Sequence, residues 1–147
     1  MRILCLPLIL TATGPAALQP GQWQITTAPG TATLDGKPLG DLPYTGPAAP
    51  AAICLTPAQA SDPAAWLGRD LPSGCTFSRK SIANGRVDLA GTCPPQADGL
   101  ARGNIRLTGR WTPTGYALRF ATSNPSENGV MGFTGTMTGQ RIGACAP

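Results

Sequence analysis

The sequence predicts a mainly β, single-domain fold: a curved antiparallel meander, a partial barrel or sandwich-like sheet, with one short helix and two disulfides. Three observations predict this class. The chain has 147 residues, enough for one modest core, and it contains 19 Gly and 16 Pro. Several short segments alternate apolar and polar residues, as half-buried strands do. Turn-forming residues separate these segments, and no long helix-forming run is present.

Residues 1–17 have the composition of a secretory signal peptide. Arg2 provides a positive start, the run from Ile3 to Leu10 is apolar, and small residues follow it. The apolar run is much shorter than the ~20 residues of a membrane-spanning helix. We therefore expect residues 18–147 to form an exported domain, periplasmic or secreted. The alternative is that the first residues form a buried strand.

The expected domain begins with two strands and a loop. Residues 22–27 alternate around Trp23, and residues 31–34 form a second short strand that ends at the turn signal Asp35-Gly36. The segment 38–50 is rich in Pro, Gly and Ala, which predicts a surface loop within the domain.

A third strand, residues 52–55, leads into the predicted helix. Residues 56–59 have the form of a capping box, with Thr at the N-cap, Pro at the first helical position and Gln at the third. Asp62-Pro63 is expected to cap a further turn that presents Trp66 and Leu67 to the core. We interpret Trp66 as a core anchor, with a ligand platform as the alternative.

Residues 75–93 predict a hairpin around a three-residue loop at 83–85, with Gly in the left-handed position. That register sets Cys75 opposite Cys93 and Lys80 opposite Asp88 as an ion pair. The first pairing predicts a disulfide.

Four cysteines remain once the signal peptide is removed, and an even number in an exported chain indicates disulfides. The hairpin register selects Cys75–Cys93 from the three possible connectivities. Cys54–Cys145 follows by elimination.

Residues 101–122 predict a second hairpin with one apolar face and one arginine-bearing face. Trp111 is expected opposite Tyr116, across the turn at 112–115. A one-residue slip would mix the two faces, so the hydrophobic pattern selects the register. The arginine-bearing face carries a candidate anion-binding set: Arg102, Arg106, Arg110 and Arg119, the last expected opposite Thr108.

Residues 131–138 form the last predicted strand, entered through a turn at 124–129. The strands that follow one another from Cys75 onward predict an antiparallel meander. Glycines within them, Gly109, Gly132 and Gly135, are expected to let the sheet bend.

The composition excludes several kinds of chemistry. The chain has no His, which excludes a Ser-His-Asp triad, a Cys-His pair and His-ligated zinc or iron. Glu127 is the one glutamate, and no C-x-x-C redox motif is present. We therefore predict no catalytic residue, no metal site and no cofactor. The net charge of +4 is modest and does not by itself indicate nucleic acid.

Several motifs resemble those of a family of small exported proteins from sphingomonads and related proteobacteria, classed as a domain of unknown function. The matching segments cover most of the expected mature chain, in order: PGQWQITT (20–27), CLTPAQA (54–60), GCTFSRKSIANGRVDLAGTC (74–93), LTGRWTPTGYALR (107–119) and TGQRIGAC (138–145). The resemblance implies no activity and no catalytic residues.

We interpret the chain as a noncatalytic binding module of the cell envelope, for an apolar small ligand or an anionic envelope component. An apolar ligand would enter a cup of aromatic residues, whose alternative role is to fill the core: Trp23, Trp111, Tyr116, Phe120 and Phe133. An anionic polymer or lipid headgroup would bind the arginine-bearing face, whose alternative role is that of a solvated surface. Nucleic acid is not expected, because exposed aromatic residues do not alternate with the arginines.

Two other functions compete with binding. The chain could act as a structural or stress-related periplasmic protein through protein contacts. An enzyme would need a carboxylate pair or a Ser-Lys arrangement, and neither stands out in the sequence.

Overall fold

The computed structural model describes residues 17–40, 49–69, 74–95 and 101–146. Almost all of the predicted signal peptide, and residues 41–48 of the predicted loop, lie outside the described residues. The described chain forms eight strands and two short helices, in this order: β1 (Gly21–Leu34), β2 (Lys37–Pro38), β3 (Ala51–Leu55), α1 (Pro57–Ala60), α2 (Pro63–Gly68), β4 (Thr76–Ala83), β5 (Arg86–Cys93), β6 (Gly103–Thr112), β7 (Gly115–Ser126) and β8 (Gly129–Gly143).

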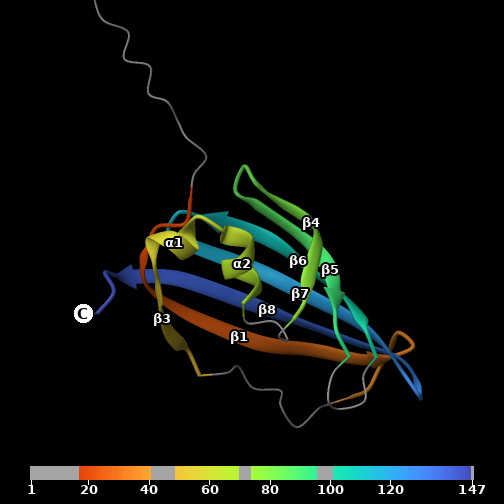
Figure 1. The fold of residues 1–147 in the computed structure, drawn as a ribbon. Coiled ribbons are helices and arrows are strands. Elements are labelled where there is room, and N and C mark those ends of the chain that lie inside the picture. The colour runs from red at the N-terminus through yellow and green to blue at the C-terminus, as the bar shows by residue number, and fades with distance from the viewer. Residues whose placement is uncertain (1–16, 41–48, 70–73, 96–100, 147) are drawn as a thin grey trace, which may run out of the picture.

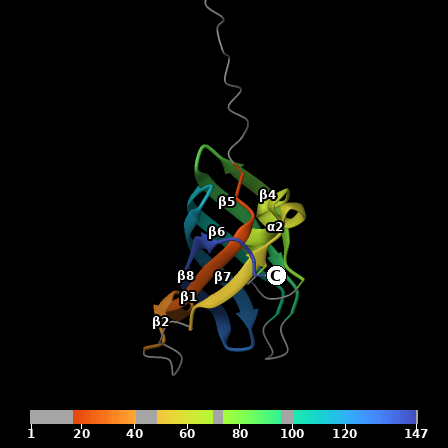
Figure 2. The same ribbon diagram turned by 90° about the vertical axis from the view of Figure 1, so that its left-hand side faces the viewer.

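All eight strands belong to one antiparallel sheet, in the order β2-β1-β8-β7-β6-β5-β4. Strand β3 also pairs with β1, at the end of β1 away from β2. The sheet is curved and does not close, and both helices lie against one of its faces (Figure 1). The curl places α2 next to β4 (Figure 2). The predicted fold class is confirmed, with a second short helix in addition to the one expected.

The core lies between the helices and the concave face of the sheet. Helix α2 contributes Trp66 and Leu67, which are 4% and 1% exposed, so Trp66 packs as a core residue. The strands contribute the apolar side chains that point inward from the sheet. These are all buried: Trp23, Ile25, Leu55, Val87, Leu89, Ile105, Leu107, Leu118 and Met137. This apolar side is what holds each strand in its register.

The capping box forms as predicted, but the helical segment divides in two. Thr56 Oγ1 accepts a hydrogen bond from Gln59 N at 3.3 Å, and Gln59 Oε1 accepts one from Thr56 N at 2.9 Å. Asp62 then caps α2 by accepting from Ala65 N at 3.1 Å. The break falls at Asp62 because a residue before Pro avoids the helical conformation, and Asp62 has φ −123° and ψ 77°.

The two strands predicted within residues 22–34 are one continuous strand, β1. A bulge between Pro29 and Ala32 joins the two halves along β8. Pro29 is tolerated because β3 begins opposite Ile25 and β2 ends opposite Thr33, so no described strand pairs with that side of β1 at Pro29.

The hairpin of β4 and β5 corrects one prediction and confirms another. Its turn has two residues, Asn84 and Gly85, both left-handed at φ 52° and 70°, as a tight hairpin turn requires. Lys80 consequently lies opposite Leu89, so the predicted pair with Asp88 is wrong.

A bulge between Phe77 and Arg79 then shifts the pairing by one residue. Thr76 therefore lies opposite Thr92, which is the predicted register near the cysteines. Cys75 and Cys93 form the predicted disulfide, with 4.0 Å between their Cα atoms.

The β6–β7 hairpin has the predicted register throughout, with Trp111 opposite Tyr116 and Thr108 opposite Arg119.

The turn predicted at residues 124–129 is shorter in the structure than the sequence suggested. Strands β7 and β8 stay paired up to Ser126 and Gly129, so the loop between them has two residues. Asn124 looked like a turn residue, but it is buried, and its Nδ2 donates to Ala101 O at 3.3 Å.

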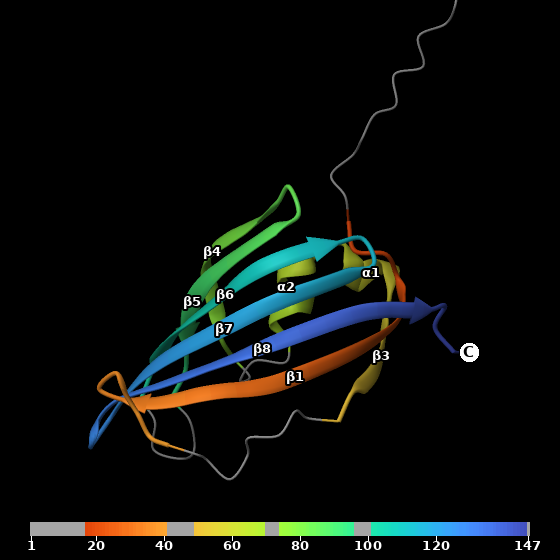
Figure 3. The same cartoon turned by 180° about the vertical axis from the view of Figure 1, so that it is seen from behind.

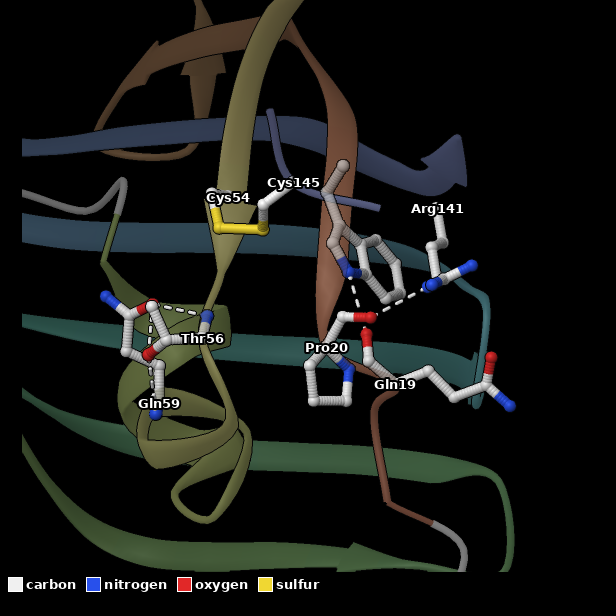
Figure 4. Close-up of a disulfide and its surroundings, with 8 residues drawn as sticks. Gln19, Pro20, Cys54, Thr56, Gln59, Arg141 and Cys145 are labelled. Carbon is white, nitrogen blue, oxygen red and sulfur yellow. Dashed lines mark hydrogen bonds between the residues drawn. A yellow bond between two sulfur atoms is a disulfide. The ribbon is translucent and has the colours of Figure 1, made fainter. Parts of the chain in front are cut away.

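The second predicted disulfide, Cys54–Cys145, ties β3 to the segment after β8, and its Cα atoms are 5.4 Å apart (Figure 4). Nearby, Arg141 Nε donates to Pro20 O at 2.9 Å. Trp23 Nε1 donates to Gln19 O at 3.0 Å. These bonds hold the start of the described chain against the end of β8.

Candidate functional site

The sheet has an outer face, which we define as the face opposite α1 and α2. Figure 3 shows this face, on which the structure places no helix from the described residues. Because neighbouring strands are antiparallel and continuously paired between the bulges, its side chains form rows across the sheet. One row consists of Thr26, Thr138, Ala117, Arg110 and Arg86. The adjacent row consists of Gln24, Gln140, Gly115 and Thr112.

Strands β4 to β8 are strongly basic, since they contain one acidic residue, Asp88. Their seven basic residues are Arg79, Lys80, Arg86, Arg106, Arg110, Arg119 and Arg141.

Asp88 pairs with two of these arginines. Its two carboxylate oxygens accept from Nε and Nη2 of Arg106, both at 3.1 Å, and Arg79 lies 3.6 Å away. The hydrogen bond from Arg106 is the main reason that the pKa of Asp88 is lowered, with a smaller contribution from the charge of Arg79. Arg106 is therefore partly neutralised within the protein.

Arg86 and Arg110 lie directly opposite each other on β5 and β6, and both are exposed. Trp111 N donates to Gly85 O at 2.9 Å, so the adjoining pair of arginines is a non-hydrogen-bonded pair, whose side chains lie closest. Like charges in this arrangement destabilise a sheet. Among the described residues, no carboxylate pairs with Arg86, Arg110 or Arg119.

Three shallow depressions follow one another across the outer face. The first has a volume of about 480 Å³ and includes Arg110 on its lining, beside Ala117 and Thr138. The second, about 120 Å³, lies between Arg106 and Arg119. The third, about 460 Å³, continues from Arg106 past Ala90 and Ala121. Arginine side chains thus line each hollow in the series.

The structure brings together part of the arginine set that the sequence predicted. Arg106, Arg110 and Arg119 share the outer face as expected. Arg102 lies in a bend before β6 begins, so strand pairing does not fix it on that face.

Sequence reasoning missed Arg86, which belongs to the same cluster. A signal for its face was present, because Arg86 directly follows the Asn84-Gly85 turn and is adjacent to the core residue Val87. Its position opposite Arg110 could not be predicted, since β5 and β6 are joined by the long segment 94–102, which sets no register.

The residues of the predicted aromatic cup lie on the inner face. Trp23, Trp111 and Tyr116 are 0%, 7% and 6% exposed, and the rings of Trp23 and Tyr116 stack with centroids 5.9 Å apart. Phe120 and Phe133 are half-buried. Trp23, Trp111 and Tyr116 belong to the buried core, and Phe120 packs against it. This supports the alternative interpretation of these four residues as core residues.

The described part of the chain contains no group of three Cys, Asp or Glu residues placed to hold a metal ion. Nor does it contain a helix with the length and apolar character needed to span a membrane. What the outer face offers is several arginines whose places on the sheet are set by strand pairing, which suits noncovalent recognition of anions.

The candidate site therefore lies on a curved, disulfide-bonded antiparallel sheet, on a basic face that neither of the described helices covers. The chain belongs to the DUF3617 family, described as proteins of unknown function, whose model matches residues 18–145. No curated protein and no solved structure matches the chain.

Proposed function

We propose that this chain is a noncatalytic binding protein of the cell envelope that holds an anionic polymer on its outer face. The observation that carries the proposal is the facing pair Arg86 and Arg110, which has no carboxylate partner among the described residues. A bound anion would lie between the two guanidinium groups and turn their repulsion into shared attraction. The two disulfides favour an oxidising compartment outside the cytoplasm.

An extended polymer fits the spacing of the charges better than a single small anion. Arg110, Arg119 and Arg106 occupy three successive rows of the sheet. Rows on one face are ~7 Å apart, because each is separated by two residues of a strand. A chain of anionic units crossing these rows would meet a guanidinium group at each step. No aromatic residue of the described strands is exposed on this face, which makes stacking with nucleic-acid bases a poor fit.

The test compares two variants of the disulfide-bonded mature protein that remove the same amount of charge. R86Q/R110Q removes the facing pair of arginines. K37Q/K80Q removes two exposed lysines: Lys37 lies on β2, and Lys80 lies opposite Leu89, whose side chain points to the inner face. Binding to fluorescently labelled polyacrylate is measured by anisotropy at low and at physiological salt. We expect R86Q/R110Q to weaken binding about tenfold at low salt, and K37Q/K80Q to change it less than about twofold.

A third variant acts in the opposite direction. Asp88→Asn removes the carboxylate that occupies Arg106 and Arg79, so it should strengthen polyacrylate binding. The proposal is overturned when the wild-type protein does not bind polyacrylate. Equal losses in the two double variants would also overturn it, because net charge alone would then explain the binding.

A further inference from the structure

The first depression of the outer face, of about 480 Å³, differs from a simple cationic patch. We call it the polar depression and define it by six of its lining residues: Gln24, Thr26, Arg110, Thr112, Thr138 and Gln140. Its volume falls within the range of roughly 300–1,000 Å³ that small-ligand sites have. Arg110 is the one charged residue among the described residues that line it, and the other five of these six are neutral amides and hydroxyls. The lining is completed by Trp111, Gly115, Tyr116, Ala117 and Gly139.

The sheet pairing fixes these groups in two rows. Gln24 lies opposite Gln140, and Thr26 lies opposite Thr138, so β1 and β8 present two amides and two hydroxyls side by side. On the other side of β8, the same rows continue to Gly115 and to Ala117, whose small side chain leaves space above it. Gln140 lies over Gly115, because a Cβ on that glycine would be 3.1 Å from Gln140 Oε1.

The chemistry of this lining indicates what it recognises. Amide and hydroxyl groups can both donate and accept hydrogen bonds, which matches the neighbouring hydroxyls of a sugar ring. Arg110 lies at the edge of the polar depression and faces Arg86 across β5 and β6. A sugar unit seated here would therefore have its acidic group within the reach of this arginine pair.

We propose that the polar depression is a subsite for one unit of an acidic polysaccharide, with the sugar hydroxyls on the Gln and Thr side chains and the acidic group on Arg110 and Arg86. This inference rests on the proposed function and specifies the chemical class of the polymer. It goes beyond charge, because it assigns a role to neutral residues that a polyanion without hydroxyls would not use.

The decisive variant fills the polar depression without changing any charge. Thr138→Leu places a bulky apolar side chain between Thr26 and Ala117. The matched control is Thr136→Leu, two residues away on the same strand and face, exposed like Thr138 and outside the polar depression. Both proteins are titrated with oligogalacturonate, with dextran sulfate and with polyacrylate, which carries carboxylates but no sugar.

We expect Thr138→Leu to weaken binding of at least one of the two saccharides about fivefold or more, the loss of about one net hydrogen bond. Its binding of polyacrylate should stay within about twofold of wild type, as should all binding by Thr136→Leu. A second variant, Q24A/Q140A, removes the amides without adding bulk and should give the same pattern. Near-ultraviolet circular dichroism would show that each variant keeps the native packing.

The subsite is overturned when Thr138→Leu leaves both saccharides within about twofold of wild type, or weakens polyacrylate equally. It is also overturned when the protein binds polyacrylate through Arg86 and Arg110 but binds neither saccharide. That result would leave the proposed function standing. Failure of the proposed function has a different signature, which is loss of arginine-dependent polyacrylate binding itself.

Discussion

Two glycines of β8 lie directly beneath aromatic rings of β7 on the inner face of the sheet. Gly139 is paired with Tyr116, and Gly135 is paired with Phe120. A Cβ atom at either glycine would overlap the ring opposite. Tyr116 also stacks on Trp23, which is completely buried, so its ring cannot move without disturbing the core. We therefore predict that Gly139→Ala destabilises the protein although it adds a single methyl group.

The magnitude follows from two opposing effects. Forcing an extra carbon into a packed core costs about 1–3 kcal/mol. Replacing Gly by Ala in a strand gives back about 0.5–1 kcal/mol, because the unfolded chain loses conformational freedom. The difference between these two ranges is about 0–2.5 kcal/mol, so the expected net loss is about 1 kcal/mol of unfolding free energy. A glycine that merely marked a flexible position would show the opposite sign.

Urea unfolding of four proteins tests the cause as well as the size. They are the wild type, Gly139→Ala, Tyr116→Leu, and the double variant. Leu lacks the distal ring atoms that a Cβ on Gly139 would meet, so Gly139→Ala should become neutral or stabilising in that background. The coupling free energy should equal the overpacking cost that the Leu background removes, about 1–3 kcal/mol. Equal effects of Gly139→Ala in both backgrounds would refute the explanation, because the ring would then not be the obstacle.

Three further predictions concern other parts of the molecule. The lowered pKa of Asp88 means that the folded state binds this proton more weakly. The stability that the ionised Asp88 contributes should be complete above its unfolded pKa of about 3.9 and should be lost as pH falls through the lower folded pKa. In Asp88→Asn, acid unfolding should lack this loss of stability. The cysteines of the Cys54–Cys145 disulfide are 91 residues apart in sequence, and those of Cys75–Cys93 are 18 apart. Replacing the first pair by Ala should lower the free energy of chemical unfolding by about 4.6 kcal/mol, and replacing the second pair should lower it by about 3 kcal/mol. A larger loss for the shorter bridge would contradict the chain-entropy estimate. Thr56→Ala should lower stability by about 1 kcal/mol, and Thr56→Ser should restore most of it in thermal unfolding.

Local features were predictable where adjacent residues carry the information. The capping box at 56–59 needs only a Thr, a Pro and a Gln at fixed spacing, and it forms as expected. The β6–β7 register follows from the alternation on both sides of one short turn, because a slip would put arginines into the core. These interactions act within a few residues, so the rest of the fold does not override them.

Predictions were wrong where a local signal served a different purpose in three dimensions. Asn124 is typical of turns, yet it lies inside β7 because its amide bonds to Ala101, which is distant in sequence. The Lys80–Asp88 pair was inferred from a loop that is one residue shorter in the structure. The bulge after Phe77 then cancels this difference near the disulfide. A bulge has no reliable sequence mark, so the correct pairing at the cysteines was reached through an incorrect turn.

The sequence by itself determined the fold class, both disulfides, the helix cap and the outward direction of Arg106, Arg110 and Arg119. It did so because two-residue alternation, cysteine number and capping chemistry are properties of short segments. Only the tertiary structure decided which strands lie side by side. That pairing places Arg86 against Arg110 and aligns the amides and hydroxyls of β1 with those of β8. The candidate site therefore depends on contacts between segments far apart in the chain. These contacts form because strand pairing buries the apolar side chains of the opposite face, and they cannot be predicted from any short segment alone.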